Sequence, residues 1–255
     1  MFRILKLIYI ENMKIYRRPR VWIMLAFLLL LNLAMGLVCR NVESLNIQSM
    51  YTFMSISINI YPLILIFAIV IASDIVSSEF SWGTIKLLLT RPLKRWKVLV
   101  SKYLAMLLFA LFFSLVLFGC SGLVGYILWE NVEDLKEQLV ISQMLLLYLL
   151  RFIDLIMYVT LTFMLSTVFL SSTLAIVVSM ILFMTKSYII IILDGINPNL
   201  AKYFVYAHSN LTHFFDGTET YNGGILGFSL TLIIFHFVLF NLISWYVFKK
   251  RDISV

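Results

Sequence analysis

Apolar residues run along the chain in long, almost unbroken stretches separated by short polar segments. The hydrocarbon core of a bilayer is roughly 30 Å thick and takes about 20 residues of α-helix to cross. Inside that core the backbone must satisfy its own hydrogen bonds, so long apolar stretches indicate membrane-spanning helices. The pattern predicts an all-α, polytopic membrane protein with six transmembrane helices, at about 21–39, 54–73, 98–129, 139–165, 172–193 and 224–248.

The composition supports this class. Hydrophobic residues make up 62% of the 255 residues and charged residues only 13%, whereas a soluble domain is about a quarter charged. Pro62 predicts a kink in the second span, and the third stretch is long enough to tilt in the bilayer. The first stretch is too long for a signal peptide and is expected to remain in the protein. Cys39 and Cys120 lie within or at the ends of apolar stretches, so no disulfide framework is indicated.

The basic residues predict the orientation, because Lys and Arg near helix ends stay on the cytoplasmic side. The loop at 130–137, which is mostly acidic, falls on the opposite side. Both termini are therefore expected in the cytoplasm, and the net charge of +7 reflects topology rather than nucleic-acid binding. The basic residues of the cytoplasmic side are Arg3, Lys6, Lys14, Arg17, Arg18, Arg20, Lys86, Arg91, Lys94, Arg95, Lys97, Lys102, Lys249, Lys250 and Arg251.

Residues 1–20 predict an amphipathic helix that Pro19 ends before the first span. A basic amphipathic helix lies in the plane of the headgroups, with its charges against anionic lipid. Anchoring the topology and contacting a partner are both open as roles. One arc of this helix carries Arg3, Lys6, Glu11, Lys14, Arg17 and Arg18, and the other carries Phe2, Ile4, Leu5, Ile8, Tyr9, Met13, Ile15 and Tyr16.

The segment 74–97 between the second and third spans combines charge with aromatic residues. Ser77 or Ser78 is a candidate N-cap, Glu79 follows in the first turn, and Arg91-Pro92 is a stop signal. One or two short helices at the inner face of the membrane are predicted here. The alternative is a solvated loop whose charges serve only orientation.

This segment resembles the E-x-x-x-G-T signature of ABC-2-type transporter permeases. The likeness extends to the plan of the chain, which has an N-terminal amphipathic helix, six spans and a longer outer segment between spans five and six. The bacitracin, lantibiotic and peptide exporters within that family are closest in size. The residues that carry the resemblance are Glu79, Gly83, Thr84, Lys86, Leu88, Pro92, Arg95 and Lys102.

The resemblance implies that the segment is a coupling helix seated in a cleft on a separate ATPase subunit. Two such ATPases, carrying ATP and Mg, would drive a pair of permeases, either two copies of this chain or one copy with a paralogue. The implied cargo is a hydrophobic or amphipathic peptide or antibiotic that crosses the bacterial cell membrane. The chain has no G-x-x-x-x-G-K-[ST] loop for nucleotide, and no cofactor of its own is expected. The expected coupling residues are Glu79, Phe80, Trp82, Gly83, Thr84 and Lys86.

An intramembrane enzyme is the alternative class. His236 and Asn241 resemble loosely the His and Asn of CAAX-type proteases, but the paired-Glu motif is missing. His208 and His213 are five residues apart, which does not place them on one helical face as a metal pair. There is no H-E-x-x-H and no G-x-S-x-G motif. No catalytic residue and no metal ligand are assigned.

Polar residues inside apolar spans are costly and are candidates for function. Arg151 and Asp154 lie three residues apart in the fourth span, so each is expected to neutralise the other. Lys186 in the fifth span has only Asp194 as a distant acidic neighbour along the sequence, and it is expected to extend toward the interface or face a wet cavity. Asn32 and Asn59 are expected to join helices or to line the path.

Two further patterns concern packing. Gly119, Gly122 and Gly125 recur every third residue in the third span and predict close contact with another helix. The outer segment 194–223 predicts short amphipathic or re-entrant helices at the outer interface, where aromatic rings gather. Its aromatic residues are Tyr203, Phe204, Tyr206, Phe214 and Phe215.

Overall fold

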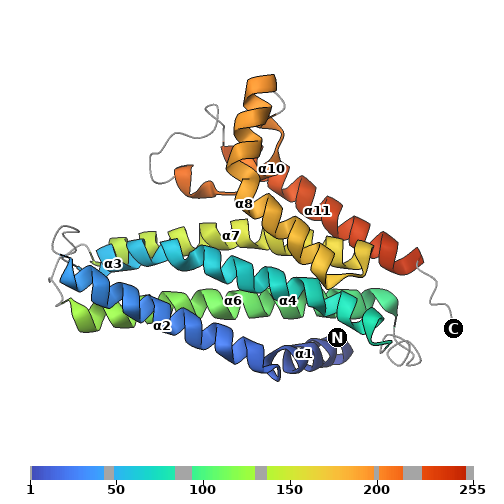
Figure 1. Cartoon of the computed structure of the whole chain (residues 1–255), viewed down its shortest axis with the longest axis horizontal. Coiled ribbons are helices and arrows are strands. Elements are labelled where there is room, and N and C mark those ends of the chain that lie inside the picture. The colour runs from blue at the N-terminus through green and yellow to red at the C-terminus, as the bar shows by residue number, and fades with distance from the viewer. Residues whose placement is uncertain are drawn as a thin grey trace.

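The computed structural model describes residues 2–42, 49–83, 94–129, 137–197, 201–214 and 226–250, and the regular elements in these residues are all helices (Figure 1). Six of the helical segments are long and apolar enough to span a membrane. The predicted all-α polytopic fold is therefore confirmed. The elements are α1 (Phe2–Tyr16), α2 (Pro19–Asn41), α3 (Met50–Ser57), η2 (Ile58–Ile60), α4 (Tyr61–Ser81), α6 (Arg95–Leu128), α7 (Glu137–Phe169), α8 (Ser172–Ile196), α10 (Val205–His208), η3 (Leu211–Phe214) and α11 (Leu226–Lys250).

The second span is built from α3, η2 and α4 in succession. Pro62 lies in the first turn of α4, directly after the 3-10 turn η2. Proline has no N–H to donate to the preceding turn, so the helix changes its winding at this point. The span thus changes its helix type just before Pro62, whereas the predicted kink stays a prediction; the span is longer at both ends than predicted.

The helix α4 also continues past the expected N-cap serines to Ser81. The Ser77 hydroxyl donates to the Ser73 carbonyl at 2.6 Å, and the Ser78 hydroxyl donates to the Asp74 carbonyl at 2.5 Å. Hydroxyls that bond the preceding turn leave the helix intact, whereas an N-cap hydroxyl accepts from an N–H group of the following turn. The prediction of a helix start at Ser77 or Ser78 was therefore wrong, and residues 84–93 lie outside the described part.

Four long helices, α2, α4, α6 and α7, lie side by side, with α4 packed against α6, α7 and α8 (Figure 1). Aromatic and aliphatic side chains fill the space between them, and Phe109 and Phe113 of α6 are completely buried. A second apolar core joins α7, α8, α10 and α11. The start of α1 and the end of α11 lie at the same end of the molecule, which we call the terminal end.

The predicted glycine contact is present at one of its three positions. A Cβ added to Gly125 would lie 3.0–3.3 Å from atoms of Met50, whereas one added to Gly119 would meet nothing within 4 Å. Gly122 only just reaches the same methionine, at 4.0 Å. The absence of a side chain therefore brings α6 close to α3 at Gly125, and the prediction was wrong for Gly119.

The outer segment folds back onto the helices in its described residues, 201–214. Tyr206 and His208 of α10 are buried, and so is Leu211 of η3. The His208 ring bonds the Ser229 hydroxyl of α11 at 2.8 Å and the Lys202 carbonyl at 3.0 Å. Burial lowers the pKa of His208, which favours the neutral ring. The expected short helices are present, and they pack on α7, α8 and α11.

Candidate functional site

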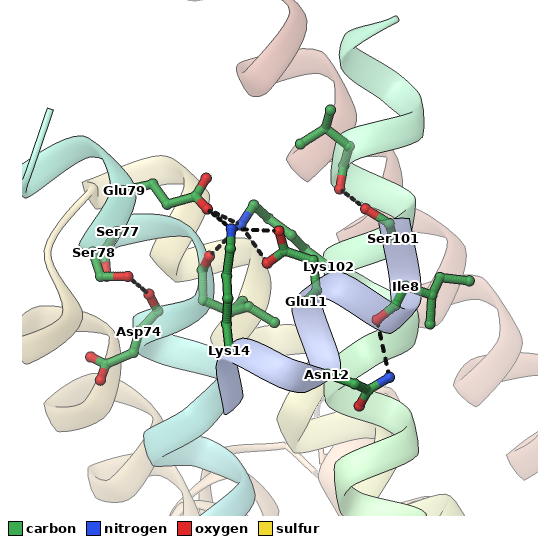
Figure 2. Close-up of polar contacts among 12 residues, drawn as sticks. Ile8, Glu11, Asn12, Lys14, Asp74, Ser77, Ser78, Glu79, Ser101 and Lys102 are labelled. Atoms are coloured by element: carbon green, nitrogen blue, oxygen red, sulfur yellow. Dashed lines mark hydrogen bonds and ion pairs between the residues drawn. The ribbon is translucent and has the colours of Figure 1, made fainter. Parts of the chain in front are cut away.

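Four charged side chains meet where α1, α4 and α6 come together at the terminal end. We call Glu11, Lys14, Glu79 and Lys102 the ion cluster. Figure 2 shows the two carboxylates and the two ammonium groups converging from three helices. Two positive and two negative charges balance, so the cluster as a whole can be buried without a net charge.

Lys102 is the centre of the ion cluster. Its side chain is only 1% exposed, and its Nζ lies 2.9 Å from Glu11 Oε2 and 2.7 Å from Glu79 Oε1. The same Nζ donates to the Ile75 carbonyl at 3.1 Å. An ammonium group has three donors, so the cluster satisfies all of them. Removing one partner of such a buried pair typically costs about 3–5 kcal/mol.

Lys14 closes the ion cluster from its outer side. Its Nζ lies 2.8 Å from Glu11 Oε1 and 2.9 Å from Glu79 Oε1. Burial acts to raise the pKa of Glu11, but Lys102 and Lys14 more than offset it, so the pKa lies below its ordinary value. Burial acts to lower the pKa of Lys14, and Glu11 and Glu79 outweigh it, so that pKa is raised. Both groups are held in their charged forms.

This geometry changes the expectation for the N-terminal helix. Glu11, on the predicted polar arc, is 5% exposed and faces the protein, while Leu5 and Tyr9 of the apolar arc are 59% and 64% exposed. The expected amphipathic helix is present, but its Glu11 meets buried Lys102 rather than headgroups. The reason is that α1 packs along α6, where Lys102 offers a counter-charge.

A second set of ion pairs ties the start of α2 to the same helices. Asp74 of α4 lies 3.4 Å from Arg18 and 2.5 Å from Arg20. Arg18 directly precedes α2, and Arg20 lies in its first turn. The terminal end therefore joins α1, α2, α4 and α6 through two neighbouring sets of charges.

The residues expected to contact an ATPase begin with Glu79 of the ion cluster and continue along the chain after it. Phe80 packs edge-to-face on Phe248 of α11, with ring centroids 6.3 Å apart. Trp82 is 75% exposed. Gly83 has φ 67°, and a Cβ there would meet nothing within 4 Å. Thr84 and Lys86 lie outside the described residues. Glu79 pairs with Lys14 and Lys102 of its own chain, so its contact with a motor stays a prediction.

A second polar cluster lies within the spans, between α7, α8 and the outer segment. Asp154 is 3.8 Å from Lys186, and it accepts a short hydrogen bond from the Ser209 hydroxyl. The expected pairing of Asp154 with Arg151 is absent from this described part of the chain. The fold brings α8 beside α7, so Lys186 supplies the counter-charge instead, from a helix that spacing along the sequence does not relate to Asp154.

Two tyrosines that the sequence did not connect with these charges complete this cluster. Tyr158 is fully buried on α7, and its ring lies 4.5 Å from that of Tyr206 on α10. The ammonium group of Lys186 lies 5.7 Å from the Tyr158 ring centroid. Arg151, Asp154 and Tyr158 follow the i, i+3, i+7 spacing of one helical face, and that spacing was the available signal. We call Asp154, Tyr158, Lys186, Tyr206 and Ser209 the Asp154 cluster, and we include Arg151 because its spacing places it on the same face of α7.

Comparison with known proteins identifies the family. A family model described as "Protein of unknown function (DUF2705)" matches residues 12–254. The chain belongs to the DUF2705 family. It is 34% identical over 227 residues to the Bacillus subtilis (strain 168) "Uncharacterized protein YhcI", covering 84% of this chain and 72% of that protein. It is 24% identical over 246 residues to the "Uncharacterized membrane protein YdbK" of the same organism, covering 95% and 100%.

The two asparagines of this DUF2705 chain have different surroundings. Asn32 is fully buried on α2, and Cys120 of α6 donates to its side-chain oxygen at 3.7 Å. Asn59 is exposed and donates to the Ile56 carbonyl of its own segment at 3.0 Å. Asn32 therefore joins two helices as predicted, whereas within the described ranges Asn59 bonds only its own segment.

The residues of the alternative enzyme hypothesis do not form a paired site in this DUF2705 chain. His236 Nδ1 bonds the Leu232 carbonyl at 3.0 Å, and the Asn241 amide donates to the Phe237 carbonyl at 2.9 Å. Each contact is with the preceding turn of α11. Within the described ranges, no three His, Cys, Asp or Glu residues lie close enough to hold a metal ion.

Proposed function

We propose that this chain is the membrane-spanning subunit of an ATP-driven exporter of the ABC-2 type in the bacterial cell membrane. The observation that supports this most directly is the position of the ion cluster. It joins α1, the end of α4 and the start of α6 beside Trp82 and Gly83 of the E-x-x-x-G-T segment. A segment that receives force from a motor needs such a rigid attachment.

The orientation follows from the basic residues of the terminal end. Lys94 precedes α6 and is exposed, and Lys249 and Lys250 end α11. Basic residues at helix ends favour the cytoplasmic side. The terminal end would then face the compartment that contains ATP, as an ATPase partner requires.

The ion cluster offers a path for force from the segment after α4 into the spans. Glu79 is in the last turns of α4, and its carboxylate holds Lys102 of α6 and Lys14 of α1. Because separating these buried charges would cost several kcal/mol, the three helices would move together. Glu79 is thus a positioning residue in this proposal, and Trp82 is the contact with the ATPase.

Trp82 and Gly83 have the properties of a docking contact. Trp82 is a large aromatic side chain left exposed beside a charged helix end, and tryptophan is enriched among the residues that dominate interfaces. Gly83 adopts the left-handed backbone region that favours glycine, and open space surrounds it. A partner surface can therefore approach the backbone closely at this turn.

The exporter would contain two ATPases, which carry ATP and Mg, and two permeases. The second permease is either another copy of this chain or a paralogue. Closing of the ATPases would switch the permease pair between inward-open and outward-open states. A hydrophobic or amphipathic peptide or antibiotic is the proposed cargo, because the spans are apolar and charges are confined to a few sites.

The test is to purify the chain alone and together with its ATPase. We expect no ATP hydrolysis and no proteolysis from the chain alone, and hydrolysis when the ATPase co-purifies. If the isolated chain cleaved a peptide and His236→Ala abolished the cleavage, the chain would be an intramembrane protease and this proposal would be wrong. Failure of every candidate ATPase to co-purify would count against the exporter.

A further inference from the structure

Among the residues that the structure describes, three donor groups of the Asp154 cluster have no hydrogen-bond partner. They are Arg151 Nε, the Tyr158 hydroxyl and the Tyr206 hydroxyl, and all three atoms are buried. Buried polar groups in proteins nearly always have a partner. Each of these atoms carries a hydrogen that it can donate. The cluster therefore lacks acceptors.

The net charge of the Asp154 cluster also indicates that an anionic acceptor is missing. Arg151 and Lys186 are cationic and Asp154 is the one carboxylate of the cluster, so a single positive charge remains. The Asp154 carboxylate already accepts from Ser209, and its 3.8 Å separation from Lys186 is too long for a hydrogen bond. A net charge inside an apolar span is costly, so a group with one negative charge would stabilise the cluster.

The Asp154 cluster can be reached from the lipid. The Lys186 side chain is 24% exposed, whereas Tyr158 and Tyr206 lie behind it. On the same helix Ile181, Met184 and Tyr188 are 56%, 60% and 68% exposed. Asp154 and Lys186 each lie about 24 Å along their helices from the turn at Leu170, at 1.5 Å per residue. That places the cluster in the half of a bilayer far from this turn.

We infer that the Asp154 cluster binds the phosphate of an anionic phospholipid. A phosphodiester carries one negative charge, which matches the excess charge, and it has more acceptor oxygens than a carboxylate. Arg151 and Lys186 would hold the phosphate by charge-assisted bonds, with the two phenols donating to its oxygens. The lipid chains would lie along the exposed apolar side of α8. This binding needs neither an ATPase nor transport, so it stands apart from the proposed function.

The experiment measures lipid retention on the purified chain by native mass spectrometry. Phosphatidylglycerol, phosphatidylcholine and inorganic phosphate are titrated separately. We expect phosphatidylglycerol to be retained preferentially, and the double variant Arg151→Gln with Lys186→Gln to bind it about tenfold more weakly. Lys202→Gln, which removes an exposed lysine of the outer segment, should bind as the wild type does. Equal retention of the two lipids, or equal binding by the double variant, would refute the inference.

The tyrosines give a test that a loss of folding cannot imitate. Tyr158→Phe with Tyr206→Phe removes two unsatisfied hydroxyls, so thermal stability without phosphatidylglycerol should be unchanged or higher. The same variant should retain phosphatidylglycerol severalfold more weakly, while Tyr188→Phe on the exposed side of α8 serves as the matched control. If the double variant retained phosphatidylglycerol as well as the wild type does, the two phenols would not contribute to the site. Inorganic phosphate binding as tightly as the lipid would show a site for free phosphate instead.

Discussion

Lys102 Nζ lies 2.7 Å from Glu79 Oε1, in a place where the lysine side chain is 1% exposed. The two residues belong to different helices, and Glu11 of a third helix completes the neutralisation of Lys102. A lysine is almost never this buried unless it is paired. The stability of the terminal end therefore depends on keeping the charges of the ion cluster balanced.

Replacing Lys102 with Met should destabilise the protein by about 3–5 kcal/mol, because Glu11 and Glu79 would then share only Lys14. Thermal unfolding in detergent measures this loss. Lys94→Met, at an exposed lysine just before α6, should change stability by less than about 0.5 kcal/mol. Adding Glu11→Gln to Lys102→Met should recover part of the stability, because the remaining Lys14 and Glu79 are balanced. A Lys102→Met protein as stable as the wild type would contradict the importance of the pairing.

The ion cluster also predicts how stability depends on pH. The pKa of Glu11 is lowered from 4.5 in the folded protein, so its contribution is complete above pH 4.5 and is lost as the pH falls through the folded pKa. The pKa of Lys14 is raised from 10.5, so its contribution is complete below pH 10.5 and is lost as the pH rises through the folded pKa. Both contributions are therefore constant between these two values.

Unfolding of the wild type and of Glu11→Gln, measured from pH 3 to 7, checks the acid side. The wild type should lose stability below about pH 4.5, and the variant should show a smaller change over the same interval. Lys6→Gln, at an exposed residue of α1, is the control. If Glu11→Gln lost as much stability in acid as the wild type does, the loss would come from carboxylates other than Glu11.

The proposed orientation predicts which positions an impermeant thiol reagent can reach. Cys39 and Cys120 are first replaced by Ala, so that only the introduced cysteine can react with the reagent. A cysteine at Asn131 should react in intact cells, and one at Lys94 should react only after permeabilisation. Labelling of Lys94→Cys in intact cells would show that the orientation is the opposite one, and the terminal end could then not contact a cytoplasmic ATPase.

Variants of Gly83 test the proposed docking contact. Gly83→Leu places a bulky side chain at φ 67°, where a Cβ meets nothing within 4 Å among the described residues, so the expected cost is about 1–2 kcal/mol of backbone strain. Gly83→Asn tolerates this backbone region better but still fills the space a partner would enter. Both variants should reach the membrane and recover less ATPase on pull-down.

Trp82→Ala should weaken ATPase recovery as well, because it removes the exposed aromatic side chain of the same turn. Lys94→Ala should leave recovery unchanged. If Lys94→Ala prevented assembly while both Gly83 variants assembled normally, the E-x-x-x-G-T resemblance would have placed the contact at the wrong part of the segment. Loss in Gly83→Leu but not in Gly83→Asn would mean that the backbone conformation matters rather than the free space.

The spans could be predicted from the sequence because length and hydropathy alone define them. The end of α4 could not, because a serine hydroxyl can cap a helix or bond the turn before it, and the choice depends on whether the backbone continues. The burial of Lys102 could not be predicted from the sequence either. Its two acidic partners are far away along the chain, and the lysine looked like an ordinary basic residue of a helix end.

The Asp154 cluster shows the same limit at longer range. Arg151 and Asp154 have the spacing of an ion pair on one helix, yet the carboxylate pairs with Lys186 across the interface between α7 and α8. Local spacing identifies which residues share a face, whereas the neighbouring helix decides which of them pair. Tyr158 shares the helical spacing of Arg151 and Asp154, but a buried tyrosine and a lipid-facing one look alike in an apolar span. Tyr206 was predicted only as an aromatic residue of the outer interface, and its burial against Tyr158 depends on how the outer segment folds back.

The helix α6 has 34 residues and contains no proline. At 1.5 Å per residue it is about 51 Å long, well beyond the thickness of a bilayer core. Lys102 fixes it near one end, and Gly125 brings it against Met50 near the other. Such a rod acts as a lever, since a tilt of about 10° at one end displaces the other by roughly 9 Å over this length. A small rotation of α6 at the ion cluster would therefore displace its opposite end, on the other side of the membrane.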